Sequence, residues 1–413
     1  MSRPRALLLT RRRCSSCTQL VVGRGQSVER PLENVTFRGI TFEHTTWLGP
    51  NSPDGYVPLQ ANVRAVGQEP RREVAQRHLQ AARLHGWQVR LVGKTTQIMG
   101  NVAAITGMPC QNLLCEPTPA ALAFHMARGI VIDQCVIARS GSAGVYLGDG
   151  AQHCAVRRSE LFDLSASAVA MGRVDTWHVT DPALQEVGNV VEECWIHDTA
   201  REFHGAAAIW AGFWKGGRIV ANTIERTSYA GVHVGWGWAL DEGYSAQNEV
   251  GFNRIDHHMQ VLSDGGGVYV TGPQPGTTIH DNYVSGRPRP KTADGRPSDS
   301  NSYEHGGGCL YFDEGASFIS ASENVCDLPH PTECDDNDCP DAYFTTGGSP
   351  AAHPTVHDVV VRATYSNNLD VINRSLHSAV EPAVDCRASW PPEAVAIMAR
   401  AGSPSFPLPA SRT

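Results

Sequence analysis

The chain has 413 residues, and its 34 basic against 42 acidic side chains give a formal net charge of −8 with histidine neutral. This balance excludes a uniformly basic surface of the kind that follows phosphate backbones, so we expect no nucleic acid partner. No stretch approaches the roughly 18 consecutive apolar residues of a membrane-spanning helix, so we expect no membrane partner either.

The N-terminal segment is basic and is predicted to be disordered. Its first apolar run, residues 6–9, is shorter than the roughly 7 to 15 residues of a secretion signal, so no signal peptide is visible. Cys14 and Cys17 have Cys-x-x-Cys spacing but no second pair at zinc spacing. We therefore expect no metal site there.

A repeat of short strands occupies the middle of the chain. Six segments share an alternation of apolar residues and end on a small or polar residue: 144–148, 168–172, 208–212, 231–235, 267–271 and 309–313. A second series of apolar segments alternates with them: 130–137, 154–161, 190–196, 218–224, 249–255, 278–284 and 318–326. Turn-forming residues separate the segments. Coils of about 22 to 25 residues with so much glycine predict an all-β fold, a right-handed parallel β-helix with a helical or irregular insertion and long loops.

This pattern also predicts the organisation of the chain. Helical spacing of apolar residues after residue 73 breaks the strand pattern, and Pro391 and Gly402 flank a second short helical pattern. We predict a basic leader (1–32), a first coil (33–66), an insertion with a short helix (67–124), the β-helix core (125–370) and a C-terminal tail with a short helix (371–413).

Stacked coils place equivalent residues about 4.8 Å apart in columns. Two predicted inward columns are apolar throughout: Val145, Val169, Ile209, Val232, Val268 and Leu310; and Leu147, Met171, Ala211, Val234, Val270 and Phe312. The outward column between them is mostly aromatic: Tyr146, Ala170, Trp210, His233, Tyr269 and Tyr311. Such a strip is unfavourable in water, so either loops cover it or flat ligands such as sugar rings stack on it.

Other repeated residues have a structural interpretation. Asn222, Asn253 and Asn282 occupy equivalent positions, where stacked amides can hydrogen-bond from coil to coil. Cys135 and Cys194 share one register and are predicted to be buried free thiols. The acidic loop 334–339 lacks the glycine and the distal glutamate of a calcium loop. We expect no metal ligand set and no cofactor.

Polar and aromatic residues concentrate between residues 199 and 315. Carboxylates beside aromatic side chains are what glycosidic cleavage requires, because one carboxyl group protonates the leaving oxygen while another attacks the sugar or activates water. The predicted substrate-binding residues are His204, Trp210, His233, Trp236, Trp238, Asp241, Tyr269 and Tyr311. The expected partner is a polysaccharide or oligosaccharide.

Several longer motifs resemble those of β-helix proteins of glycoside hydrolase family 141. The motifs are residues 35–47, 56–60, 231–238, 264–269, 274–276 and 313–315. This resemblance implies a secreted glycoside hydrolase with a right-handed parallel β-helix that acts on plant or algal polysaccharide, since the family includes α-L-fucosidase and xylanase activities. It also implies that Asp264 and Asp313 are the catalytic acids.

The separation of these two acids needs an explanation. Asp264 lies four residues before Val268, whereas Asp313 lies three after Leu310. A straight strand would place them about 23 Å apart, while catalytic carboxyl groups lie roughly 5 to 9.5 Å apart. Either the glycines at 265–267 fold the chain back, or the second acid is another residue, with Glu314, Asp241 and Glu242 as the reserves.

Two other functions remain open. One is a non-catalytic glycan-binding or adhesin-like β-helix, in which the aromatic column binds sugars. The other is a polysaccharide lyase, which would call for calcium-binding acids and a basic residue facing uronates, although the outward columns carry little basic charge.

Overall fold

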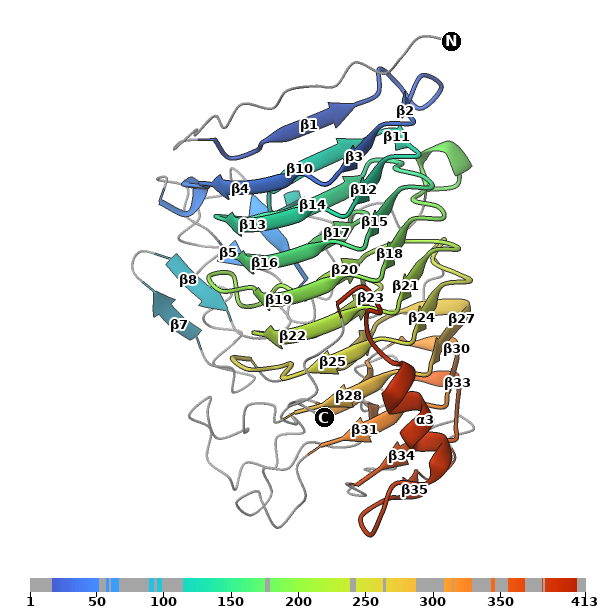
Figure 1. Ribbon diagram of the computed structural model, residues 1–413. Helices are drawn as coiled ribbons and strands as arrows, with labels where there is room; N and C mark the ends of the chain where they lie inside the picture. Colours follow the sequence, from blue (N-terminus) through green and yellow to red (C-terminus); the bar gives the residue numbers. More distant parts are fainter. Residues whose placement is uncertain are drawn as a thin grey trace.

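In the computed structural model, the described residues are 17–51, 57–58, 61–66, 89–92, 95–98, 114–174, 179–237, 243–262, 265–286, 308–313, 315–328, 343–345, 356–367, 381 and 383–406. They wind into a stack of coils, with the blue N-terminal strands at one end and the orange and red strands at the other (Figure 1). Each full coil contributes one strand to each of three parallel sheets, and the chain visits the sheets in the same order every time. The fold is the predicted right-handed parallel β-helix.

The three sheets are named by the order of their first strands. Sheet 1 contains β1 (Val21–Arg24), β10 (Ala120–His125), β14 (Ala143–Gly148), β17 (Val169–Met171), β20 (Ile209–Ala211), β23 (Val232–Val234), β26 (Gly266–Val270), β29 (Gly308–Phe312) and β32 (Tyr343–Thr345). Sheet 2 contains β3 (Thr36–Arg38), β12 (Val131–Asp133), β15 (Ala155–Arg157), β18 (Val190–Glu192), β21 (Arg218–Val220), β24 (Glu249–Gly251), β27 (Pro273–His280), β30 (Ser317–Ser322) and β33 (His357–Arg362). Sheet 3 contains β4 (Thr41–Thr45), β13 (Val136–Ser140), β16 (Glu160–Leu164), β19 (Trp195–Thr199), β22 (Thr223–Thr227), β25 (Arg254–Asp256), β28 (Tyr283–Ser285), β31 (Val325–Asp327), β34 (Tyr365–Ser366) and β35 (Val384–Asp385).

Smaller elements lie outside these sheets. They are the parallel pair β2 (Leu32–Glu33) and β11 (Ala127–Arg128), the antiparallel sheet of β5 (Val57–Pro58), β6 (Val63–Val66) and β9 (Leu114–Pro117), the antiparallel pair β7 (Val89–Val92) and β8 (Thr95–Ile98), the 3-10 helices η1 (Gly49–Asn51) and η2 (Pro182–Leu184), and the helix α3 (Pro392–Arg400). The sequence predicted α3 from its proline-first pattern. The helix packs Ala394 and Ile397 against Tyr283 and Val325 on sheet 3.

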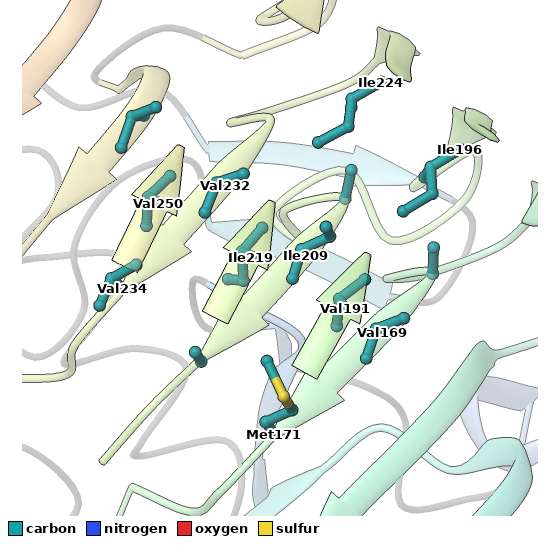
Figure 2. Packing of buried hydrophobic residues seen from close by; sticks show 14 of the residues in the cluster. Val169, Met171, Val191, Ile196, Ile209, Ile219, Ile224, Val232, Val234 and Val250 are labelled. Carbon is teal, nitrogen blue, oxygen red and sulfur yellow. The ribbon is translucent and has the colours of Figure 1, made fainter. Parts of the chain in front are cut away.

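The interior is filled by the two predicted inward columns of sheet 1. Val169 pairs with Ile209, Ile209 with Val232, and Val232 with Val268, as the alignment predicted. Their side chains meet apolar residues of the other two sheets in one buried core, which includes Val191 of sheet 2 and is shown in Figure 2. Each coil buries a similar apolar set, so burial fixes the register from one coil to the next.

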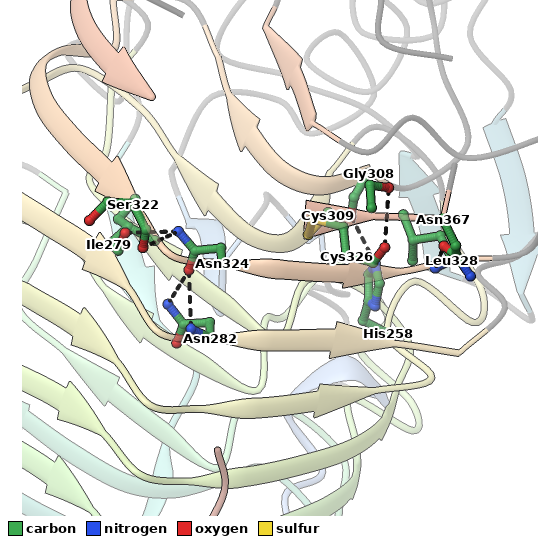
Figure 3. The surroundings of a disulfide bond; sticks show 11 residues. His258, Ile279, Asn282, Gly308, Cys309, Ser322, Asn324, Cys326, Leu328 and Asn367 are labelled. Carbon is green, nitrogen blue, oxygen red and sulfur yellow. Dashed lines mark hydrogen bonds between the residues drawn. A yellow bond between two sulfur atoms is a disulfide. The ribbon is translucent and has the colours of Figure 1, made fainter. Parts of the chain in front are cut away.

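The corner between sheets 2 and 3 is held by the predicted asparagine ladder. The Asn222 side chain donates to Asn253 Oδ1 at 2.9 Å, and Asn253 donates to Asn282 Oδ1 at 3.0 Å. The ladder extends one coil beyond the prediction, because Asn282 donates to Asn324 Oδ1 at 2.9 Å (Figure 3). The residue before each ladder position adopts a left-handed conformation, as at Ala221 (φ 54°). The side-chain amides therefore hydrogen-bond to buried backbone groups that the sharp turn leaves without a partner in the sheets.

The cysteines divide into two groups. Cys135 and Cys194 are buried and free, which confirms that prediction. Cys309 of β29 and Cys326 of β31 form a disulfide that joins sheet 1 to sheet 3 through the core (Figure 3). Cys17 is also disulfide-bonded. Among the described residues, no group of His, Cys, Asp or Glu could hold a metal ion.

Two strands lie outside the coil boundaries that the sequence suggested. β1 falls within the stretch predicted to be a leader, and it pairs with β10 along its whole length. β10 in turn begins at Ala120, inside the predicted insertion, and pairs with β14. A short strand such as Val21–Arg24 is stabilised by its neighbour rather than by its own sequence, so its pattern is weak. Residues 67–88, where the short helix was predicted, lie outside the described residues.

Candidate functional site

The outer face of sheet 1 carries the predicted aromatic column. Tyr146 pairs with Ala170, Trp210 with His233, and Tyr269 with both His233 and Tyr311 in the ladder. The side chains of Tyr146, Ala170 and Trp210 belong to one cluster outside the core that fills the coils, and those of Tyr269 and Tyr311 belong to another. The predicted register and direction of the column are therefore present in the structure.

Chain segments cover this column instead of leaving it open to solvent. Trp210, His233 and Tyr269 are all 0% exposed. Ala61, Val63, Phe203 and Trp236 belong to the cluster of Trp210, while Met259 and Leu262 belong to the cluster of Tyr269. The sequence left two explanations for the aromatic column, covering loops or stacked sugar rings, and the structure shows that other chain segments cover it. An open aromatic platform is excluded for these three side chains.

A second outward column, two residues further along each strand, explains how the rings fit. It reads Gly148, Gly172, Gly212, Gly235, Thr271 and Asp313. A Cβ on Gly148 would lie 2.2 Å from the Tyr146 hydroxyl, and one on Gly212 would lie 2.8 Å from the Trp210 ring. The glycines thus allow the rings to lie along their own strands. In the last two coils of this series the column changes to Thr271 and Asp313, which makes this part of the face polar.

Asp313 lies at the carboxyl end of β29 and is 6% exposed. Its carboxylate accepts a hydrogen bond from the Tyr269 hydroxyl of the preceding coil. Its backbone N–H donates to Val270 O at 2.9 Å, and its carbonyl accepts from Ala316 N at 2.9 Å. Both the backbone and the side chain of this acid are therefore fixed by neighbouring coils.

Aromatic side chains extend from Asp313 across three coils. The Tyr269 ring lies 4.4 Å from the His233 ring, measured between centroids. Trp210 meets Trp236 edge to face, with centroids 6.1 Å apart. Two predicted residues, Tyr269 and Asp313, are thus in direct contact, and three others, Trp210, His233 and Trp236, continue the same group of side chains.

The remaining predicted residues are not all in this group. His204 Nδ1 lies 2.9 Å from Ala200 O and 3.3 Å from Ser228 Oγ, near the amino ends of the sheet 1 strands. Asp313, by contrast, follows the carboxyl end of its strand. Tyr311 packs on Tyr269 with ring centroids 5.0 Å apart. The other predicted residues lie outside the described residues: Trp238, Asp241, Glu242, Asp264 and Glu314.

Four neighbouring side chains carry buried polar atoms with no hydrogen-bond partner among the described residues. These atoms are Trp210 Nε1, both ring nitrogens of His233, Thr271 Oγ1 and Gln274 Oε1. Burial lowers the pKa of His233 to about 3, so its imidazole is neutral at physiological pH. Sequence reasoning missed Thr271 and Gln274 as site residues, although Gln274 belongs to one of the motifs that carry the family resemblance.

A buried carboxyl group beyond the predicted residues lies at the same edge of sheet 1. Glu186 is fully buried, accepts a hydrogen bond from Gly150 N at 3.1 Å and contacts the Tyr244 hydroxyl. Tyr244 also donates to Phe213 O at 2.8 Å. Burial raises the pKa of Glu186 to about 7, against the opposing effect of the Tyr244 hydroxyl and the Gly150 N–H. This network joins four consecutive loops, those that follow β14, β17, β20 and β23.

The raised pKa of Glu186 predicts how stability depends on pH. The protonated carboxyl group favours the folded state. Its contribution to the free energy of unfolding is therefore fully present below pH 4.5 and is lost as the pH rises through about 7. Glu186→Gln imitates the protonated acid. We expect this variant to match the wild type at pH 4 and to have a free energy of unfolding about 3 kcal/mol higher at pH 8. Denaturant unfolding of both proteins at the two pH values measures this, and parallel pH curves would contradict it.

Comparison with known proteins identifies a similar fold but does not identify the activity. No family model matches the chain, and no curated protein matches it in sequence. A solved structure named "Glycoside hydrolase" superimposes with a TM-score of 0.61 at 22% sequence identity. The match covers 94% of this chain and 53% of that one, so this chain spans about half the length of the matched structure. No helix among the described residues is long and apolar enough to cross a membrane.

Proposed function

We propose that this chain is a carbohydrate-active enzyme, a glycoside hydrolase that cleaves plant or algal polysaccharide or oligosaccharide with a pair of carboxyl groups. The observation that carries the proposal is Asp313, a nearly buried carboxylate held by Tyr269 beside a group of covered aromatic and polar side chains. The superposition on a protein named as a glycoside hydrolase supports it. The motifs that resemble family 141 support the finer assignment to that family.

The roles of the two acids are proposed from the contacts of Asp313. We assign Asp313 to the carboxylate that attacks the anomeric carbon or activates water, because the Tyr269 hydroxyl donates to it and holds it in place. Asp264 is proposed as the acid that protonates the leaving oxygen. The proposal requires the chain between Asp264 and Gly266 to bring the two carboxyl groups within roughly 5 to 9.5 Å.

The covered aromatic column argues against the binding-module alternative. A non-catalytic module would present aromatic rings to an extended glycan, whereas Trp210 and Tyr269 are 0% exposed. We also propose that the protein is secreted, because the Cys309–Cys326 disulfide suits an oxidising compartment.

The test is an assay of the full chain against fucosylated pectin fragments, xylans and algal polysaccharides. We expect release of reducing sugar that is insensitive to a calcium chelator, without an ultraviolet-absorbing product. A calcium-dependent, ultraviolet-absorbing product would identify a lyase. Tight binding of a glycan without any bond cleavage would identify a binding module. Either result overturns the proposal.

A further inference from the structure

A chain of hydrogen bonds through Glu186 and Tyr244 joins loops of four consecutive coils. Gly150 lies on the loop after β14, Glu186 on the loop after β17, Phe213 on the loop after β20 and Tyr244 on the loop after β23, and these strands are neighbours in sheet 1 (Figure 1). Glu186 is 0% exposed, so its carboxyl group is closed to bulk water. The position of each proton therefore depends on the partners within the chain.

The Tyr244 hydroxyl has a single proton for two oxygen partners. It lies 2.8 Å from Phe213 O, and it also contacts Glu186 Oε2. A backbone carbonyl oxygen can only accept. Both contacts are hydrogen bonds if Tyr244 donates to Phe213 O and accepts from a proton on Glu186 Oε2, while Glu186 Oε1 accepts from Gly150 N at 3.1 Å. The whole chain is paired when the Glu186 carboxyl group is neutral.

Loss of that proton to solvent leaves one donor for two acceptors. The Glu186 carboxylate is then the stronger acceptor, because it is charged. The Tyr244 proton therefore turns from Phe213 O to Glu186 Oε2, and Phe213 O loses its hydrogen bond to Tyr244. Ionisation of one buried acid thus breaks the chain between the loop after β20 and the loop after β23.

The charged groups around this buried acid favour its neutral form. Burial would raise the pKa of Asp149, but hydrogen bonds from His125 and Arg173 hold it at about 2, so the Asp149 carboxylate is ionised. Arg24 lies 3.5 Å from the same carboxylate. Lys215 contacts the buried acid through the backbone, where its N–H donates to the acid's carbonyl oxygen at 3.0 Å. Among the described residues, the cations here are thus bonded to Asp149 and not to the buried carboxyl group.

We propose that Glu186 is a proton switch: the neutral acid leaves the Tyr244 hydroxyl bonded to Phe213 O, and the ionised acid takes that hydroxyl away. Burial, helped by the Asp149 carboxylate, raises the pKa of Glu186 to about 7, so the change falls near neutral pH. The chain of hydrogen bonds that joins these four loops is continuous below neutral pH and interrupted above it. This inference does not rest on the proposed hydrolase.

Phe213 can be observed by itself, because Phe213–Trp214 is the one place in the sequence where tryptophan follows phenylalanine. Labelling the full chain with 13C at phenylalanine carbonyls and 15N at tryptophan therefore gives a single backbone HNCO peak. The Trp214 N–H is buried and donates to Ser245 Oγ at 3.1 Å, which slows its exchange with water. We expect the carbonyl resonance to move to lower chemical shift between pH 5 and 9, with a midpoint of about 7, because an accepted hydrogen bond deshields the carbonyl carbon.

Two variants should hold this peak at opposite ends of the titration. Glu186→Gln keeps a donor toward Tyr244 and an acceptor toward Gly150 N, so its peak should stay at the acidic position at every pH. Tyr244→Phe removes the hydroxyl, so its peak should stay at the alkaline position. Tyr283→Phe removes a buried hydroxyl from sheet 3 and is the matched control, which should titrate like the wild type.

The wild-type titration alone decides whether this hydrogen bond depends on pH, so the test does not require either variant to fold. A Phe213 peak that stays in place between pH 5 and 9 would overturn the proposal. A shift that persists in folded Glu186→Gln would also overturn it, because His125 or another titrating group would then be the cause. Glycan hydrolysis enters none of these measurements, so either proposal can fail without the other.

Discussion

Asp313→Asn is expected to lower the rate of glycan hydrolysis by about a thousandfold while the protein stays folded. The amide has the size of the acid, and its oxygen can still accept the hydrogen bond from the Tyr269 hydroxyl. It cannot attack an anomeric carbon or take a proton from water. Initial rates of reducing-sugar release, measured with thermal unfolding of the same preparations, give the comparison.

The chain offers a matched control for this variant on another sheet. Tyr283 donates to Asp327 at 2.7 Å, and this pair joins the same two coils as Tyr269 and Asp313 but lies on sheet 3. Asp327→Asn should therefore leave the rate within about twofold of the wild type, since Asp327 lies on another sheet and the reaction at Asp313 is unchanged. Full activity in Asp313→Asn would reject Asp313 as a catalytic acid. An equal loss in Asp327→Asn would trace the loss to the fold.

The stacking of the coils could be predicted because it depends on a short-range pattern. Strands such as Val169–Met171 and Val232–Val234 contain two inward residues and one outward residue. Aligning their apolar residues fixes the register, since a shift by one residue would turn the apolar pair outward. The asparagine ladder followed from the same alignment. In both cases the same residue type recurs at the equivalent position of successive coils, so one coil can be aligned on the next.

The surroundings of the site could not be predicted in this way. Trp210 clusters with Ala61 and Val63, and Tyr269 with Met259 and Leu262; these four residues come from outside the repeated strands. The Tyr269–Asp313 hydrogen bond joins residues 44 positions apart, and nothing in either strand alone indicates it. Glu186 precedes Val187, which pairs with Gln152 and Lys215 of the neighbouring coils, so the residues at its register are Ala151 and Trp214 rather than acids. Such contacts depend on tertiary packing, so the sequence identified the residue types but not their burial.

Tyr269 itself was predicted to bind substrate, and its burial against Asp313 suggests a different role. We expect Tyr269→Phe to lower kcat/KM about ten- to a hundredfold, the effect of losing one hydrogen bond to a charged group. The loss should fall on kcat rather than on KM, because a hydroxyl that holds the Asp313 carboxylate in place acts in the reaction step. Initial rates over a range of substrate concentrations, with unfolding curves of the same preparations, measure both effects.

Tyr283→Phe is the control, because it removes the equivalent hydroxyl from Asp327. It should have a similar stability cost but should leave kcat and KM of hydrolysis unchanged. A positioning role for Tyr269 requires kcat per folded molecule to fall, since a purely structural loss would lower only the amount of folded enzyme. If Tyr269→Phe lowers the rate only in proportion to the folded fraction, the hydroxyl does not position Asp313. The ring would then act only through its packing against His233 and Tyr311.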